Sequence, residues 1–137
     1  MAVRGSGGSR KAVAALAVTV LAGGALAAVA VAGVEKFDSR TTISRFLPLY
    51  HGKVNSPEPK CRRGRNVILF ERRPGKDLKL GRDRTSKRGK WKVRVPAGQL
   101  QPNDRFYARA RRKLNIVSGN GYVCRADRSR TVTFVGD

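Results

Sequence analysis

The amino-acid sequence predicts an all-β protein in which one small antiparallel β-sandwich follows an N-terminal hydrophobic helix. Short segments beyond residue 45 alternate apolar with charged side chains, which is the pattern of strands that bury one face. Gly, Pro, Asn and Asp separate these segments, and no amphipathic helical stripe follows residue 35. A chain of 137 residues has room for one such domain.

Residues 1–33 have the pattern of a secretory signal peptide or a membrane anchor. Arg4, Arg10 and Lys11 precede an uncharged run of Ala, Val, Leu and Gly, which ends in overlapping small-x-small cleavage sites. The run is long enough to span a bilayer, but its low content of Leu, Ile and Phe favours a cleaved signal over a permanent anchor. Because a basic N-terminus stays in the cytoplasm, we expect the domain to be secreted or held at the cell surface.

The expected domain begins after a polar tether at residues 34–45, where no period is visible. It covers residues 46–137 and opens with a strand at residues 46–54, in which Pro48 indicates an edge position or a bulge. The nearly continuous apolar run at residues 66–70 predicts a central strand that is covered on both faces.

The later strands are expected at residues 78–80, 90–95, 105–111 and 130–134, and the last three alternate clearly. Their inward side chains would be Trp91, Val93, Val95, Phe106, Ala108, Ala110, Val132 and Phe134. The inward position of Trp91 favours a role in the core over a role as a surface stacking platform.

Two cysteines lie far apart in the sequence, Cys61 after the first expected strand and Cys124 before the last. In an exported protein an even count of two indicates one disulfide. The bond would close a loop of roughly 60 residues, worth about 4 kcal/mol in the chain-entropy model. The alternatives are two free thiols or half a metal site. Because His51 is the sole histidine and no Cys-x-x-Cys pair exists, no metal or cofactor is expected.

Four motifs in the part of the chain from Tyr50 to Ala110 carry a family resemblance. They are Gly52-Lys53-Val54, Gly64-Arg65-Asn66-Val67-Ile68-Leu69, Thr85 with Gly89-Lys90-Trp91-Lys92-Val93, and Phe106-Tyr107-Ala108. In order and spacing they resemble the carboxypeptidase-regulatory-like, transthyretin-like β-sandwich family. The resemblance implies an Ig-like or transthyretin-like sandwich that serves as an accessory, stalk or binding module, and it implies no catalytic residue. The cysteine pair and the basic load are departures from the general family pattern.

Most of the formal net charge of +21 belongs to the domain, because only three of the 30 basic residues lie in the leader. The outward side chains of two strands would form basic ridges: Lys90, Lys92 and Arg94 on one strand, and Arg105, Arg109 and Arg111 on the other. If the two strands share a sheet, like charges lie opposite each other and destabilise it, and a bound polyanion would relieve the repulsion. The alternative is that the long stems splay into water.

The sequence offers little support for catalysis or for specific nucleic-acid readout. His51 is the one conventional base, and no acidic residue lies near it in sequence. We therefore expect no enzyme and no catalytic residue. Only Tyr107 has the parity to interleave with the arginines, whereas single-stranded nucleic acid is typically bound by several exposed aromatic side chains.

The favoured hypothesis is an exported, non-catalytic module that binds or scaffolds at the cell envelope through acidic polymers or other polyanions. It would contact a membrane only through an uncleaved N-terminal segment. One alternative is a membrane-anchored, cytosol-facing nucleic-acid binder with reduced cysteines. Another is a small secreted hydrolase in which His51 meets an acid and a nucleophile in space. A fourth is a purely scaffolding domain. The sequence specifies neither the ligand nor the oligomeric state.

Overall fold

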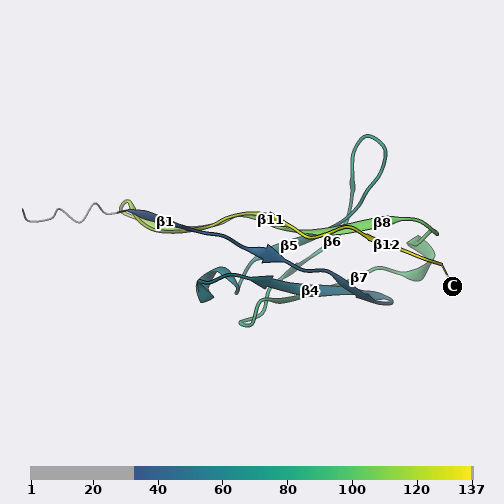
Figure 1. Cartoon of the computed structure of the whole chain (residues 1–137), viewed down its shortest axis with the longest axis horizontal. Helices are drawn as coiled ribbons and strands as arrows, with labels where there is room; N and C mark the ends of the chain where they lie inside the picture. Colours follow the sequence, from purple (N-terminus) through teal and green to yellow (C-terminus); the bar gives the residue numbers. More distant parts are fainter. Residues whose placement is uncertain (1–32, 137) are drawn as a thin grey trace, which may run out of the picture.

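The computed structural model describes residues 33–136, which form an all-β protein with several antiparallel sheets (Figure 1). The strands are β1 (Val34–Phe37), β2 (Arg40–Thr41), β3 (Ser44–Phe46), β4 (Leu49–Asn55), β5 (Asn66–Glu71), β6 (Leu78–Arg84), β7 (Lys90–Arg94), β8 (Arg105–Ala110), β9 (Lys113–Val117), β10 (Asn120–Cys124), β11 (Asp127–Arg128) and β12 (Val132–Thr133). Two short 3₁₀ turns, Pro59–Cys61 and Ala97–Gln99, complete the elements of this part. The signal or anchor predicted at the N-terminus falls on residues outside the described part, apart from Gly33. Within residues 33–136, no helix has the length and apolar character needed to cross a bilayer.

The first layer is organised around β4, which pairs antiparallel with β7 along one edge and with β2 and β3 along the other. The chain between β2 and β3 passes so close to β4 that a Cβ atom at Gly52 would lie 2.0 Å from the carbonyl oxygen of Thr42. Glycine at position 52 therefore permits the close approach of the two strands, which is a known use of glycine inside a strand.

The second layer is organised around β5, which lies between β6 and β8, with β11 and β12 on the far edge of β8. Figure 1 shows this layer above the layer of β4 and β7, and the hairpin of residues 72–77 projects away from both. The inner faces of the two layers enclose the core. Its members from β4, β7, β5 and β8 include Tyr50 and Phe106, whose ring centroids lie 4.9 Å apart.

The inward side chains predicted from the alternation are confirmed on β7 and β8. Trp91, Val93 and Val95 are buried, as are Phe106, Ala108 and Ala110. Val132 and Phe134 are partly buried and pack against the same core. The core role predicted for Trp91 is thus correct, with only 2% of its surface exposed.

Two aspartates tie the edges of the layers together. The backbone N–H of Lys92 on β7 donates to Oδ2 of Asp83 on β6 over 2.8 Å. At the other edge, the N–H of Thr41 on β2 donates to Oδ2 of Asp127 on β11 over 2.5 Å. Each carboxylate therefore satisfies one backbone donor of an edge strand of the opposite layer.

An arm of three strands extends from one end of the two layers, at the left of Figure 1. The hairpin of β9 and β10 forms most of it, and β1 pairs parallel with β10. The predicted disulfide is confirmed at its base, where Cys61 in the first 3₁₀ turn is bonded to Cys124 at the end of β10 with 5.3 Å between their Cα atoms. Both cysteines are fully buried.

Arg65 is the largest fully buried side chain among the described residues, and nothing in the sequence distinguishes it from the exposed arginines. Its guanidinium donates to three backbone carbonyls, those of Cys61 at 2.8 Å, Arg111 at 2.9 Å and Arg125 at 2.8 Å. It also donates to Oγ of Ser39 over 2.7 Å. Burial lowers the pKa of Arg65, and Asp127 nearby opposes that shift. The side chain joins four separate segments next to the disulfide.

Two predictions about the N-terminal half are wrong. The tether expected at residues 34–45 forms β1, β2 and the start of β3, with Thr41 and Ile43 buried. These strands are too short to show a period, and their partners lie far away in sequence. The single strand expected at residues 46–54 is instead the hairpin of β3 and β4, and Pro48 lies in its turn rather than at an edge or bulge.

The strand at residues 66–70 exists as β5, but it is not covered equally on both faces. Val67 and Leu69 are fully buried, whereas Ile68 and Phe70 on the other face are partly buried. The last expected strand is shorter than predicted, since β12 contains only two residues.

The hydroxyl of Tyr50 is buried with no hydrogen-bond partner among the described residues, and burial raises its pKa to about 12. Because the ordinary value is 10.0, the unfolded chain loses this proton first as the pH rises. We expect the free energy of unfolding to fall by roughly 2 to 3 kcal/mol between about pH 10 and pH 12 from this group.

The Tyr50→Phe variant should lack that part of the pH dependence and should match or exceed the original protein in stability at pH 7. Urea unfolding of both proteins at pH 8, 10 and 12 measures the difference, in which the shared titration of lysines cancels. Equal losses of stability in the two proteins between pH 10 and pH 12 would contradict the assignment.

Candidate functional site

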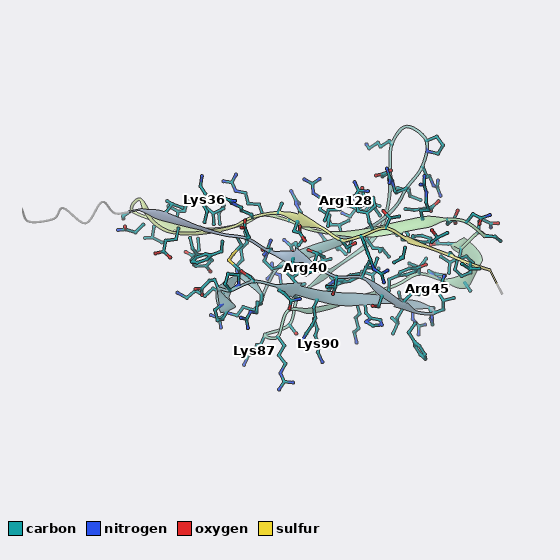
Figure 2. All side chains as sticks on the ribbon, in the orientation of Figure 1. Lys36, Arg40, Arg45, Lys87, Lys90 and Arg128 are labelled. Carbon is teal, nitrogen blue, oxygen red and sulfur yellow. A yellow bond between two sulfur atoms is a disulfide. The ribbon has the colours of Figure 1, made fainter. Side chains whose placement is uncertain are left out.

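The two predicted basic ridges lie on different layers. Because β7 pairs with β4 whereas β8 pairs with β5, the ridges do not share a sheet, and the cross-strand repulsion expected between them does not arise. Alternation places both ridges outside the common core, so they lie on opposite faces of the molecule. Figure 2 shows Lys90 below the layer of β4 and β7, and Arg128 on the other layer.

The first of these surfaces, here called the β4–β7 face, consists of the outward residues His51, Lys53, Lys90, Lys92 and Arg94. The register places Lys53 opposite Lys90, and His51 opposite Lys92. Like charges do therefore oppose each other across a sheet, but within this layer. Opposed like charges destabilise a sheet unless a counter-charge lies between them.

A groove of about 830 Å³ crosses the β4–β7 face. Lys53, Lys90 and Lys92 line it together with His51 and with Arg84 from the end of β6. Arg94 lies at the other end of β7, opposite Leu49, and does not belong to the lining. The groove thus gathers two of the three predicted residues of this ridge.

Asp83 is the acidic side chain of this groove, and both of its oxygens already accept backbone hydrogen bonds. Oδ1 accepts from the N–H of Arg84 and Oδ2 from the N–H of Lys92, each over 2.8 Å. The carboxylate is therefore held at the β6–β7 corner and forms no salt bridge with the lysines. The cationic ends of the side chains around the groove remain available to an external anion.

The second surface, here called the β5–β8 face, consists of the outward residues Ile68, Phe70, Arg105, Tyr107 and Arg109. The register across β6, β5, β8 and β11 forms one row, Arg82, Ile68, Arg109 and Arg128. Arg109 and Arg128 are directly opposite each other, so this face also opposes like charges. A hollow of about 400 Å³ beside the row is lined by Ile68, Phe70, Arg109, Arg111, Arg112 and Ala126.

Aromatic rings form part of the β5–β8 face. Phe70 and Tyr107 stack with 5.3 Å between ring centroids, and the guanidinium of Arg128 lies 3.8 Å above the Tyr107 ring. Such a contact is a cation–π interaction. The sequence indicated only Tyr107 here, because residues 66–70 were expected to be covered on both faces. The outward parity of Phe70 is the signal that could have identified it.

The hydroxyl of Tyr107 fixes the projecting hairpin of residues 72–77 beside this face. It donates to Oδ2 of Asp77 over 2.6 Å, and the N–H of Arg73 donates to Oδ1 of the same carboxylate. The bond from Tyr107 lowers the pKa of Asp77, whereas burial followed by that bond raises the pKa of Tyr107. The ring of Tyr107 is thus held in one orientation, with Arg128 over it.

His51, the one conventional base in the sequence, lies on the β4–β7 face. His51 lines the groove together with Ser44, its cross-strand partner, and with Asp83. Among residues 33–136, no hydrogen bond joins His51 to either of them, and Asp83 is occupied by backbone donors. Within the same described part, no three His, Cys, Asp or Glu side chains gather as metal ligands. What the arrangement can do chemically is attract and hold negative charge.

Further cations that the sequence did not indicate belong to these surfaces, among them Arg84 at the groove. Lys53 completes the lysine cluster of the groove, Arg82 extends the row on the β5–β8 face, and Arg128 covers Tyr107. Their membership depends on strand register, which no local pattern displays. Comparison of the chain with protein-family models, with curated proteins and with solved structures finds no match in any of the three.

Proposed function

We propose that this protein is an exported, non-catalytic module that binds polyanions, such as acidic polymers of the cell envelope, through its two basic faces. The observation that carries the proposal is the opposition of like charges within each layer, Lys53 with Lys90 and Arg109 with Arg128. A protein that only needed solubility gains nothing from such pairs, which destabilise a sheet. A polyanion laid across either face would supply the missing counter-charge.

The scarcity of internal counter-ions supports the same proposal. Within residues 33–136 the two salt bridges are Arg73 with Glu71 and Arg125 with Asp38, and neither involves a residue of the two faces. The cations of both faces therefore have no carboxylate partner within 4 Å in this part of the chain. Together with the formal net charge of +21, this leaves a field that attracts extended anions.

Two further features belong to the proposal. The Cys61–Cys124 bond is compatible with an oxidising compartment outside the cytoplasm, whereas a cytosol-facing nucleic-acid binder would keep its thiols reduced. The two facing layers are compatible with a transthyretin-like β-sandwich of the carboxypeptidase-regulatory-like type. We propose this fold family on the sequence motifs, and the binding function does not depend on it.

Neutralising the two faces should weaken binding to heparin, used as a model polyanion. In the face variant, Lys53, Lys90, Lys92, Arg109, Arg111 and Arg112 are replaced by Gln. We expect its dissociation constant at fixed salt to rise roughly tenfold or more, and the dependence of affinity on salt to become less steep, because fewer counter-ions are released. Titration at several salt concentrations measures both quantities.

The matched control replaces six exposed cations that lie outside the two faces with Gln: Lys36, Lys60, Arg63, Arg72, Lys76 and Arg130. It removes the same charge and should stay within roughly threefold of the original affinity if location matters beyond net charge. Equal losses in the two variants would show that no face is special. Binding that does not respond to salt would contradict an electrostatic mechanism altogether.

A further inference from the structure

The two basic faces point away from each other, and this arrangement has a consequence for the number of ligands. The side chains of the β4–β7 face and the β5–β8 face emerge from the outer surfaces of two layers that share one core. A polyanion that lies along one face is separated from the other face by the whole protein core. Figure 2 shows cationic side chains on both sides of the ribbon, with Lys87 and Lys90 on one side and Arg128 on the other.

The two faces are far enough apart that charge bound on one has little influence on the electrostatic potential of the other. Packed sheets lie about 10 Å apart, and the long Lys and Arg stems extend outward from each of them. The Debye length at physiological ionic strength is about 8 Å. Along the solvent path around the molecule this screening is strong, so that anion bound on one face lowers the potential of the other face only weakly and a second anion still has a site.

The two faces also differ in chemistry while accepting the same class of ligand. The β4–β7 face offers lysine ammonium groups around a groove, which act as compact point charges. The β5–β8 face offers planar guanidinium groups beside the stacked rings of Phe70 and Tyr107. Ammonium and guanidinium groups both bind the sulfate, phosphate or carboxylate groups of an acidic polymer. Each face can therefore hold such a polymer by its own contacts.

We infer that the protein is bivalent and cross-bridges two polyanion chains, one bound on the β4–β7 face and one on the β5–β8 face. This inference rests on the proposed function. Its consequence is that the protein links acidic polymers into a network instead of coating a single chain. Once one molecule bridges two chains, further molecules that bridge the same two chains gain strength from effective concentration, because the second chain is already held nearby.

Stoichiometry with short heparin oligosaccharides, too short to reach around the molecule, tests the inference. By calorimetric titration at about 0.15 M salt, the intact protein should bind two oligosaccharides. The variant with Gln at Lys53, Lys90 and Lys92 should bind one, and so should the variant with Gln at Arg109, Arg111 and Arg112. A control with Gln at Lys36, Arg63 and Lys76 should still bind two.

Capture of a second chain provides an independent readout. Protein held on immobilised heparin should retain a subsequently added, fluorescently labelled heparin chain, and either face variant should retain at least fivefold less of it. Each face variant tests the inference by itself if the other does not fold. One oligosaccharide per intact protein, or no capture, would overturn bivalence and leave the proposed function standing. The absence of any binding to the intact protein would overturn the proposed function as well.

Discussion

Replacing Arg65 with methionine should lower the free energy of unfolding by about 3 to 5 kcal/mol. Methionine fills much of the same volume, but it leaves the carbonyls of Cys61, Arg111 and Arg125 without their donors inside the protein. Each buried acceptor without a partner costs about 1 to 3 kcal/mol. Equilibrium unfolding in urea, followed by the fluorescence of Trp91, measures the change.

Arg63→Met is the matched control, because Arg63 is exposed two residues away and its side chain takes no part in this cluster. We expect it to change stability by no more than about 0.5 kcal/mol. Arg65→Lys should recover only part of the loss, since one ammonium group cannot reach acceptors on three separate segments. If Arg65→Met unfolds at the same urea concentration as the original protein, the guanidinium does not hold these segments together.

Removing the disulfide should lower the free energy of unfolding by about 4 kcal/mol, because the bond closes a long loop in the unfolded chain. The two cysteines are 63 residues apart in sequence, and both are fully buried. The Cys61→Ala and Cys124→Ala double variant, compared with the oxidised protein in urea, measures this contribution. Alanine in both places avoids the free thiol that a single replacement would leave.

The disulfide and Arg65 act on the same corner of the molecule, since the guanidinium binds the carbonyl of Cys61. The effects of removing both should therefore differ from the sum of the separate effects by more than 0.5 kcal/mol, as contacting residues generally do. If the Cys61→Ala and Cys124→Ala double variant loses less than about 1 kcal/mol of stability, the cross-link contributes little to this fold.

The parts of the fold that the sequence predicts correctly are those in which a local pattern reflects burial. Trp91, Val93 and Val95 alternate with lysine and arginine because β7 has one wet face, and the same holds for β8. The disulfide between Cys61 and Cys124 was predicted without any periodic pattern, because two cysteines can form only one intramolecular bond with each other.

The candidate site was predicted only in part, because its membership depends on neighbours that are distant in sequence. Lys90, Lys92, Arg109 and Arg111 are among the residues that line hollows on the surface. Their companions Lys53 and Arg128 come from other strands, and Phe70 was hidden within an apolar run. Arg65 resembled the many exposed arginines around it, since burial of a charge leaves no local signature.

By itself, the sequence determined that this chain is all-β and which side chains of its clearest strands face inward, and it favoured one disulfide over free thiols or half a metal site. These are consequences of local periodicity and composition. Only the tertiary structure decided that the basic ridges lie on opposite faces, that residues 34–45 belong to the sheets, and that Arg65 is enclosed. The physical reason is that strand pairing joins residues far apart in the chain. The hydrogen bonds between paired strands are made by the backbone, so the side chains near a strand do not reveal which strand it pairs with.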